Sequence, residues 1–222
     1  MPPPTSRSPT RALRPTPDDS PTASGAAGVP FIGLTGGIGA GKSTALAALE
    51  RLGAATLSTD AVVHSLYETD AVRALVVERF GEEVAPGGVV DRAALAARAF
   101  ATEEDRHWLE QMLWPRVGEA VGAWRKAQQR AEPPRRALVV ETPLLFEAGL
   151  DRGYDVTIAV VADEQIRSSR AQARSHRALA ERTARQLSQD EKAQRATCTV
   201  VNDGSEAELE TKLSAILDRL CR

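Results

Sequence analysis

The sequence predicts an α/β fold in which a parallel β-sheet carries helices on both faces. Three observations predict it: short apolar segments alternate with helical patterns, the first apolar segment runs into a glycine-rich turn, and one long helical block interrupts the alternation. Strands that alternate with helices form parallel sheets, because each connection has to cross a face of the sheet. The helical block, over about 67–132, predicts an insertion within a core formed by about 31–66 and 135–222.

The first predicted strand and helix flank the glycine-rich turn. Residues 31–35 are apolar and of strand length, and residues 42–52 place apolar side chains on one helical face. Gly53 follows as a typical helix stop. Residues 54–59 form the second apolar run of strand length, which ends at Asp60.

The insertion and the second half of the core continue the pattern. Helical periodicity covers 61–80, 91–100 and 103–130, with a loop over 81–88 and a bend expected at Pro115. The remaining predicted elements are strands over 137–141, 156–162 and 199–201, a charged helical segment over 164–193 and a closing amphipathic helix over 206–220.

The composition fits a soluble globular protein and excludes several classes. Of the 222 residues, 42% are hydrophobic and 26% are charged, and the formal net charge of −2 argues against a strongly basic nucleic-acid binder. The two cysteines form no CxxC pair, which excludes a disulfide scaffold or structural zinc site and fits a reducing, cytoplasmic compartment. No apolar run approaches the ~20 residues that span a bilayer.

Residues 1–30 differ from the rest of the chain. They hold eight of the thirteen prolines and eight Ser or Thr, with almost no large apolar side chains. Such a segment cannot bury enough surface to offset the entropy lost on ordering. It therefore predicts a disordered tail, followed by one folded domain over 31–222.

The segment 36–43 fits the phosphate-loop pattern G-x-x-x-x-G-K-[ST] between a strand and a helix. Glycines let successive N–H groups turn toward a phosphate, and the next helix aims its positive end at the same place. Lys42 adds a positive charge at the outer phosphates, where it is a candidate catalytic residue, and the Ser43 hydroxyl suits Mg²⁺. ATP and Mg²⁺ are the expected cofactors. The residues expected to bind ATP here are Gly37, Ile38, Gly39, Ala40, Gly41, Lys42, Ser43 and Thr44.

A phosphate loop alone does not separate kinases from other nucleotide hydrolases. A GTPase should show the guanine-reading motif N-K-x-D, which this sequence lacks, and motor or transporter ATPases are much longer. A small-molecule kinase fits the chain better.

Two acids follow predicted strands, at the carboxyl edge of the sheet where open α/β folds bind ligands. Asp60 can accept the proton of an attacking hydroxyl, although an Asp in this position is usually a helix N-cap, and both roles stay open. Glu141 ends the apolar run 137–140 as in a Walker B strand, so it is a candidate to hold Mg²⁺ through water. A chance acid at a strand end is the alternative.

A late segment is rich in arginine. Arginine forks match the negative charge spread over a phosphoryl group in transfer, and a lid that carries them would exclude water. A solvated basic helix face is the alternative for most of them. The residues are Arg167, Arg170, Arg174, Arg177, Arg182 and Arg185.

Several segments together resemble the dephospho-CoA kinase family. They run in register from about residue 31 to 218, and Pro-Leu-Leu-Phe-Glu at 143–147 is the most specific of them. The others are 32–44, Asp60, 80–81, 90–92, Leu95, Gln186, 191–192, 195–196 and 202–205.

The resemblance implies a P-loop nucleotide kinase fold and the last step of coenzyme A synthesis, in which ATP phosphorylates the ribose 3′-hydroxyl of dephospho-CoA. It implies Asp60 as the base, Arg170 and Arg174 as catalytic cations, a lid over about 163–187 and Asn202 near the adenine. The residues implied to bind dephospho-CoA are Asp60, Asp91, Arg92, Pro143, Leu144, Phe146 and Glu147.

Three departures from the family pattern bear on activity. Ser58 stands where the family usually has the first acid of Asp-x-Asp, which leaves the second acid to act alone. Trp114 stands where the family usually has the histidine of His-Pro. The implied lid is a few residues short after Arg174.

Two other functions stay open at this point. The chain could phosphorylate another nucleotide or small alcohol, or it could be an ATP-binding regulatory module without catalysis. ADP release that depends on the acceptor separates these readings. We expect a monomer or small homo-oligomer, with no nucleic-acid or membrane partner.

Overall fold

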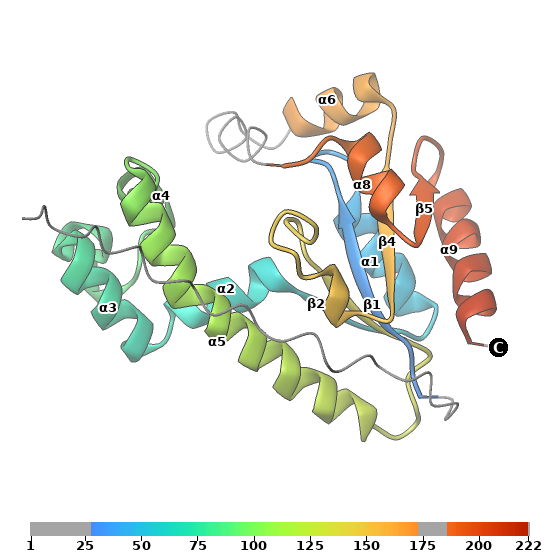
Figure 1. The fold of residues 1–222 in the computed structure, drawn as a ribbon, viewed down its shortest axis with the longest axis horizontal. Coiled ribbons are helices and arrows are strands. Elements are labelled where there is room, and N and C mark those ends of the chain that lie inside the picture. The colour runs from blue at the N-terminus through green and yellow to red at the C-terminus, as the bar shows by residue number, and fades with distance from the viewer. Residues whose placement is uncertain (1–27, 173–185, 222) are drawn as a thin grey trace, which may run out of the picture.

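The computed structural model of the chain describes residues 28–172 and 186–221, and these form a five-stranded sheet flanked by helices (Figure 1). The strand order is β2-β3-β1-β4-β5 and every neighbouring pair is parallel, which confirms the predicted α/β class. The strands are β1 (Phe31–Gly36), β2 (Ala55–Ser58), β3 (Leu138–Glu141), β4 (Val156–Val161) and β5 (Cys198–Val201).

The described helices follow the predicted order with two differences. The pattern over 61–80 divides into two helices, because the Thr69 hydroxyl accepts a hydrogen bond from the Val72 N–H (3.4 Å) and caps a new helix. The segment predicted as helical over 164–193 is not helical at 186–188. The helices are α1 (Lys42–Arg51), α2 (Thr59–Tyr67), α3 (Asp70–Phe80), α4 (Arg92–Ala99), α5 (Glu103–Gln129), α6 (Glu164–Gln172), α8 (Gln189–Arg195) and α9 (Glu206–Leu220).

Alternate residues of β1 point to opposite faces of the sheet. Ile32 and Leu34 lie in the main core cluster, together with apolar side chains of α1 and α9. Phe31 lies in a smaller cluster on the other face, with Val121 and Trp124 of α5 packed against it. Helices α1 and α9 therefore cover one face of the sheet, and the C-terminal half of α5 covers the other.

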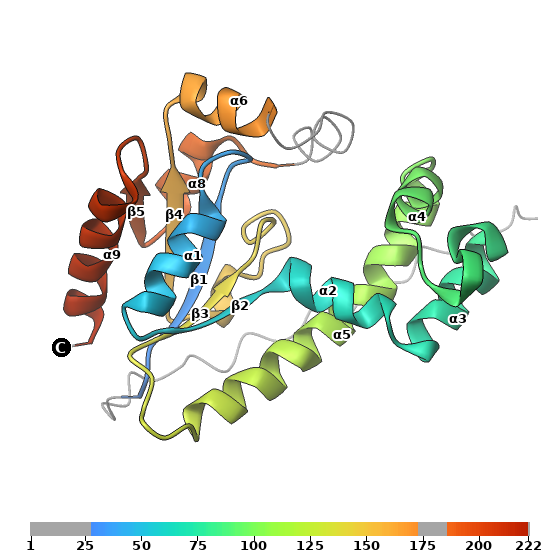
Figure 2. The ribbon, with the colours of Figure 1, turned by 180° about the vertical axis from the view of Figure 1, so that it is seen from behind.

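Helices α2 to α5 stand between β2 and β3 in the sequence. Figure 2 shows α3, α4 and the N-terminal half of α5 beyond the edge of the sheet. These helices have an apolar cluster of their own, which includes Val76, Leu95 and Leu109. Helix α5 continues through Pro115 and joins this outer part to the sheet. The described chain therefore has a main core and a separate helical core.

Some of the sequence-based expectations fall outside the described residues. They are the tail up to residue 27, most of the expected lid over 173–185, and with it Arg174, Arg177, Arg182 and Arg185. Within the described part of the chain, no helix is both long enough and apolar enough to cross a membrane.

Candidate functional site

The phosphate loop connects the end of β1 to the start of α1. Gly39 (φ 77°) and Gly41 (φ 91°) both adopt left-handed backbone conformations, which residues with a Cβ rarely do. A Cβ on Gly39 would collide with the carbonyl oxygen of Arg167, and a Cβ on Gly41 would collide with the side-chain amide of Asn202. Both glycines are therefore required by the backbone and by close neighbours.

Lys42 opens α1 and folds back over the loop. Its Nζ donates hydrogen bonds to the carbonyl oxygens of Gly36 (3.0 Å) and Gly37 (3.2 Å). The first turn of α1 contains no acidic residue, so its positive dipole end keeps its full effect on an anion. Ala40 is fully buried in the main core cluster, while Ser43 is exposed. The loop is thus anchored through Ala40, and its Ser43 side chain stays accessible.

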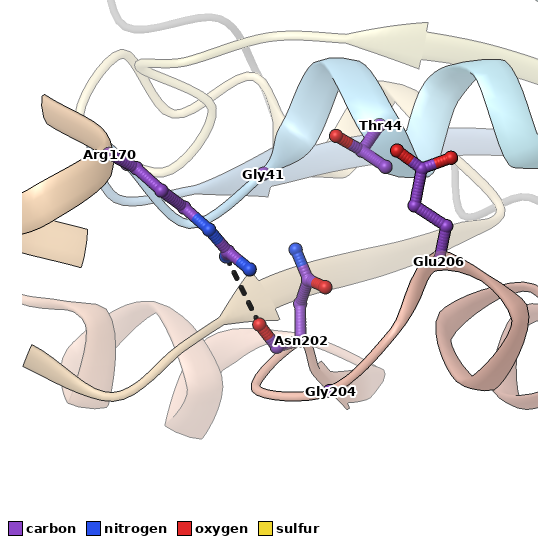
Figure 3. A pocket seen from close by; sticks show the side chains of 7 residues that line it. Gly41, Thr44, Arg170, Asn202, Gly204 and Glu206 are labelled. Carbon is purple, nitrogen blue, oxygen red and sulfur yellow. Dashed lines mark hydrogen bonds between the residues drawn. The ribbon is translucent and has the colours of Figure 1, made fainter. Parts of the chain in front are cut away.

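A pocket of about 330 Å³ opens beside this loop (Figure 3). Asn202 forms one wall, where its Nδ2 donates to the carbonyl oxygen of Ala40 (2.9 Å). The Arg170 guanidinium reaches from α6 and donates to the carbonyl oxygen of Asn202 (3.1 Å). Thr44 and Glu206 line the pocket on the side of α1 and α9. The pocket brings together four residues expected to bind ATP, namely Gly39, Gly41, Thr44 and Asn202, and one expected catalytic cation, Arg170.

Helix α6 packs directly on the phosphate loop through Arg167. Its Nε donates to the carbonyl oxygen of Ile38 (3.1 Å), and its guanidinium lies beside Gly37. Glu164, one turn earlier, accepts from the same guanidinium (2.7 Å). From the sequence, Arg167 had no individual role and was named only as one of six arginines in the late segment. Its spacing of three residues from Arg170 was the signal, since it places both on one face of a helix.

Asp60 and Glu141 lie at the carboxyl ends of neighbouring strands. Asp60 is exposed in the first turn of α2, and Ser58 is the N-cap residue, so the N-cap interpretation of Asp60 is wrong. Glu141 is buried, and its Oε2 accepts a hydrogen bond from the Ser58 hydroxyl (2.8 Å). Burial raises the pKa of Glu141 above its usual value, while Lys42 and the Ser58 hydrogen bond oppose that shift. A nearby cation would therefore favour the ionised carboxylate.

Asp91 and Arg92 occupy the start of α4, across from α2. The Asp91 carboxylate caps the helix, since its Oδ1 accepts from the N–H groups of Ala93 (2.8 Å) and Ala94 (3.1 Å). The Arg92 guanidinium contacts the ring of His64 on α2. Sequence reasoning gave His64 no role, although it stands four residues after Asp60 on the same helical face.

Tyr67, at the end of α2, belongs to the same region. Burial raises its pKa to about 12, and the charge of Arg92 opposes part of that shift. The Tyr67 hydroxyl therefore keeps its proton at physiological pH.

The segment 143–147 forms a turn after β3. The Pro143 carbonyl oxygen accepts from the Thr35 hydroxyl (3.3 Å), which ties the turn to β1. Phe146 is largely buried, and Leu144 is half-buried. Glu147 forms an ion pair with Lys192 of α8 (2.9 Å). The structure thus places Glu147 against another part of the protein, a partner that local sequence does not reveal.

The described residues include no cluster of three or more His, Cys, Asp or Glu side chains that could hold a metal ion. The two groups expected at Mg²⁺ are Ser43 and Glu141. Mg²⁺ keeps several waters and needs few protein oxygens when phosphate supplies the rest, so this donor set fits a nucleotide-bound ion. Trp114, in the place usual for a histidine, is half-exposed on α5.

Comparisons with known proteins point to one family. A model of the dephospho-CoA kinase family matches residues 30–208. The curated dephospho-CoA kinase of Deinococcus radiodurans is 39% identical over 193 residues, which cover 85% of this chain and 91% of its own. The corresponding protein of Symbiobacterium thermophilum is 40% identical over 180 residues, covering 79% and 74%.

Solved structures agree on the fold. A crystal structure of a Thermus thermophilus protein is 34% identical and superposes with a TM-score of 0.70, covering 87% of this chain and 98% of that one. The dephospho-CoA kinase of Campylobacter jejuni is 21% identical with a TM-score of 0.57, covering 86% and 97%.

Proposed function

The chain belongs to the dephospho-CoA kinase family and catalyses the final step of coenzyme A biosynthesis, and from this premise we propose which of its residues carry out the reaction. ATP is the phosphoryl donor and dephospho-CoA the acceptor. The acceptor atom is the ribose 3′-hydroxyl. The observation that carries the proposal is the phosphate loop at the positive end of α1, with Asp60 at the neighbouring strand end.

Residues 37–44 hold the phosphates of ATP, with backbone N–H groups of the loop as donors and Lys42 at the outer phosphates. The pocket beside Gly41 and Asn202 takes the adenosine part. Arg170 lines this pocket, and we assign it, with Arg174, to the charge of the moving phosphoryl group. Arg167 joins this set, since its guanidinium already lies against the loop.

Asp60 accepts the proton of the 3′-hydroxyl as the oxygen forms its bond to the terminal phosphorus and ADP leaves. Its place in the first turn of α2, exposed and beyond the carboxyl end of β2, suits an acceptor that enters between the sheet and the outer helices. We assign the same acceptor to Arg92, the first residue of α4, and to Leu144 and Phe146 in the turn after β3. Asp91 acts by capping α4, which positions Arg92.

Mg²⁺ would be held by the Ser43 hydroxyl and, through water, by Glu141. The ion supplies positive charge at the phosphates when it is bound. The buried carboxylate of Glu141 supports this assignment, because burial penalises its charge and a cation offsets that penalty.

The substitution Asp60→Asn tests the base. We expect kcat to fall by roughly 10²–10⁴, the usual contribution of a positioned general base, while ATP affinity stays unchanged. Asp70→Asn is the matched control, because Asp70 also stands exposed in the first turn of a helix, where it pairs with Arg73. The measurement is ADP release with ATP, Mg²⁺ and dephospho-CoA, with adenosine and AMP as control acceptors. Full kcat in Asp60→Asn would contradict the assignment.

We also propose a monomer or small homo-oligomer in the cytoplasm. The two cysteines are unpaired, and Cys221 is exposed, which suits a reducing compartment. Sedimentation velocity under reducing conditions measures the oligomeric state.

A further inference from the structure

Lys192 is a charged side chain with none of its surface exposed to solvent. Burying an ammonium group is costly unless it is paired and hydrogen-bonded. Lys192 stands on α8, away from the phosphate loop in sequence, and the reaction as described above does not use it. Its contacts therefore indicate what the buried charge is for.

The ammonium joins three parts of the chain that meet under the phosphate loop. Its Nζ donates to the Pro143 carbonyl oxygen (2.6 Å) and to the Thr35 hydroxyl (3.4 Å). It also pairs with Glu147 Oε1 at 2.9 Å. Thr35 is fully buried in β1, immediately before the glycines of the loop. Lys192 thus fixes both ends of the 143–147 turn and holds that turn against the strand that carries the loop.

Glu147 extends this connection to the chain that enters α8. Its Oε1 also accepts from the Leu187 N–H (2.8 Å). The next residue, Ser188, starts α8 with a capping box that it shares with Glu191. Glu147 Oε2 is buried and has no hydrogen-bond partner. Lys192 is therefore the positive charge that offsets the Glu147 carboxylate. Removing either side chain alone would leave the other charge buried without its partner.

We propose that Lys192 and Glu147 form a positioning pair, which fixes the acceptor-binding turn at a set distance from the phosphate loop. The proposal rests on the assignment of this turn to dephospho-CoA. Lys192 has no exposed surface with which to touch a substrate, so the pair acts through Pro143, Leu144 and Thr35. A misplacement of about 1 Å can reduce a rate by 10²-fold. Holding the acceptor at the right distance from ATP can therefore offset the cost of burying two charges.

The test is the double variant Glu147→Gln/Lys192→Met. It removes both charges together, so neither is left buried without its partner, and the glutamine can still accept from the Leu187 N–H. We expect a folded protein whose kcat with dephospho-CoA falls between about tenfold and 10²-fold. ATP affinity and the slow hydrolysis of ATP without acceptor should stay unchanged. The matched control is Glu210→Gln/Arg51→Met, which removes an exposed ion pair between α1 and α9.

Wild-type kcat and KM for dephospho-CoA in the folded double variant would overturn the proposal, because the pair would then serve stability alone. Equal losses of transfer and acceptor-free hydrolysis would also overturn it, since they would locate the defect in the phosphate loop. If this double variant does not fold, Glu147→Gln/Lys192→Gln gives the same comparison, because it also removes both charges together and leaves an amide at position 192 as a hydrogen-bond donor. Leu144→Ala tests the turn separately: an unchanged KM for dephospho-CoA there would contradict the acceptor assignment without altering the pair.

Discussion

Glu141 and Ser58 show how one residue changes the chemistry of its neighbour. Their strands are in register, so the two residues stand side by side at the carboxyl edge of the sheet. An Asp at position 58, as the family resemblance leads one to expect, would place two carboxylates together and raise the cost of ionising both. Ser58 instead donates a hydrogen bond to Glu141. This chain therefore has one carboxylate in the paired last residues of β2 and β3, and Asp60 follows two residues later in the first turn of α2.

The raised pKa of Glu141 predicts a pH dependence of stability in the metal-free protein. The native state binds this proton more tightly than the unfolded chain, so the carboxyl contributes most below its unfolded pKa, near 4.5. That contribution is lost as the pH rises through the higher native pKa. The variant Glu141→Gln lacks this contribution to stability at every pH. We therefore expect the variant to gain stability relative to the wild type from pH 4.5 upward, as measured by urea unfolding at each pH. A difference that does not change with pH contradicts this.

At the residue scale, sequence predicts what is local and misses what is distant. The phosphate-loop residues could be named in advance because the motif's glycines, lysine and serine act within one turn of chain. The role of Glu147 could not, because its partner Lys192 lies 45 residues away and becomes adjacent only in the fold. Asp91 shows a third case, in which a residue implied at the substrate also serves as an N-cap, as Asp commonly does.

For whole helices, the boundaries are set by capping residues, and the spacing of apolar residues does not reveal these. The pattern over 61–80 is continuous, yet α2 ends at Tyr67 and Thr69 caps the start of α3. In contrast, Gly53 gave the end of α1 correctly: its φ of 91° turns the chain so that the N–H of the next residue, Ala54, bonds back to the Leu49 carbonyl oxygen (3.0 Å). The prediction of one helix through Pro115 is also confirmed, since α5 runs from Glu103 to Gln129 with the proline inside it.

Helix α5 carries two glycines in its interior, and one of them offers a stabilising change. A Cβ on Gly118 would meet no other side chain or element within 4 Å, so alanine fits there. Because alanine loses less backbone entropy in a helix, we expect Gly118→Ala to raise the free energy of unfolding by about 0.5–1 kcal/mol, with kcat unchanged. Gly39→Ala is the contrasting variant, since its Cβ would strike the Arg167 backbone, and it should destabilise. Urea unfolding measures both, and a loss of stability in Gly118→Ala would contradict the prediction.

In the whole molecule, the residues assigned to ATP and those assigned to dephospho-CoA are supported by different hydrophobic cores. The order of strands and helices made the parallel sheet predictable, because each crossover leaves a periodic trace in the sequence. The interrupted alternation also predicted a helical insertion over about 67–132, but the side chains that form its apolar cluster could not be named, since the apolar faces of its helices look like any others until their partners are known. In the structure, Ala40 of the phosphate loop belongs to the main core, whereas Arg92 starts a helix that packs in the other.

This division predicts that damage to each core should affect a different substrate. Leu95→Ala removes a side chain that is 2% exposed in the helical core, and Leu213→Ala removes one that is fully buried beside α1. Each should cost about 2–5 kcal/mol of stability. We expect Leu95→Ala to raise KM for dephospho-CoA with ATP affinity unchanged, because α4 carries Arg92. Leu213→Ala should weaken ATP binding, because α9 supports α1 and its loop.

Hydrogen exchange separates this from a general loosening of the fold. In Leu95→Ala, protection should fall in α3, α4 and the first half of α5, while β1 and α1 keep theirs, because regions with separate cores open with separate free energies. In Leu213→Ala, the loss should appear first in α1 and α9. A uniform loss of protection in both variants, with both substrates affected alike, would mean that the two cores unfold as one unit. The helical part would then be a cooperative extension of the sheet, and acceptor binding could not be altered without altering the nucleotide site.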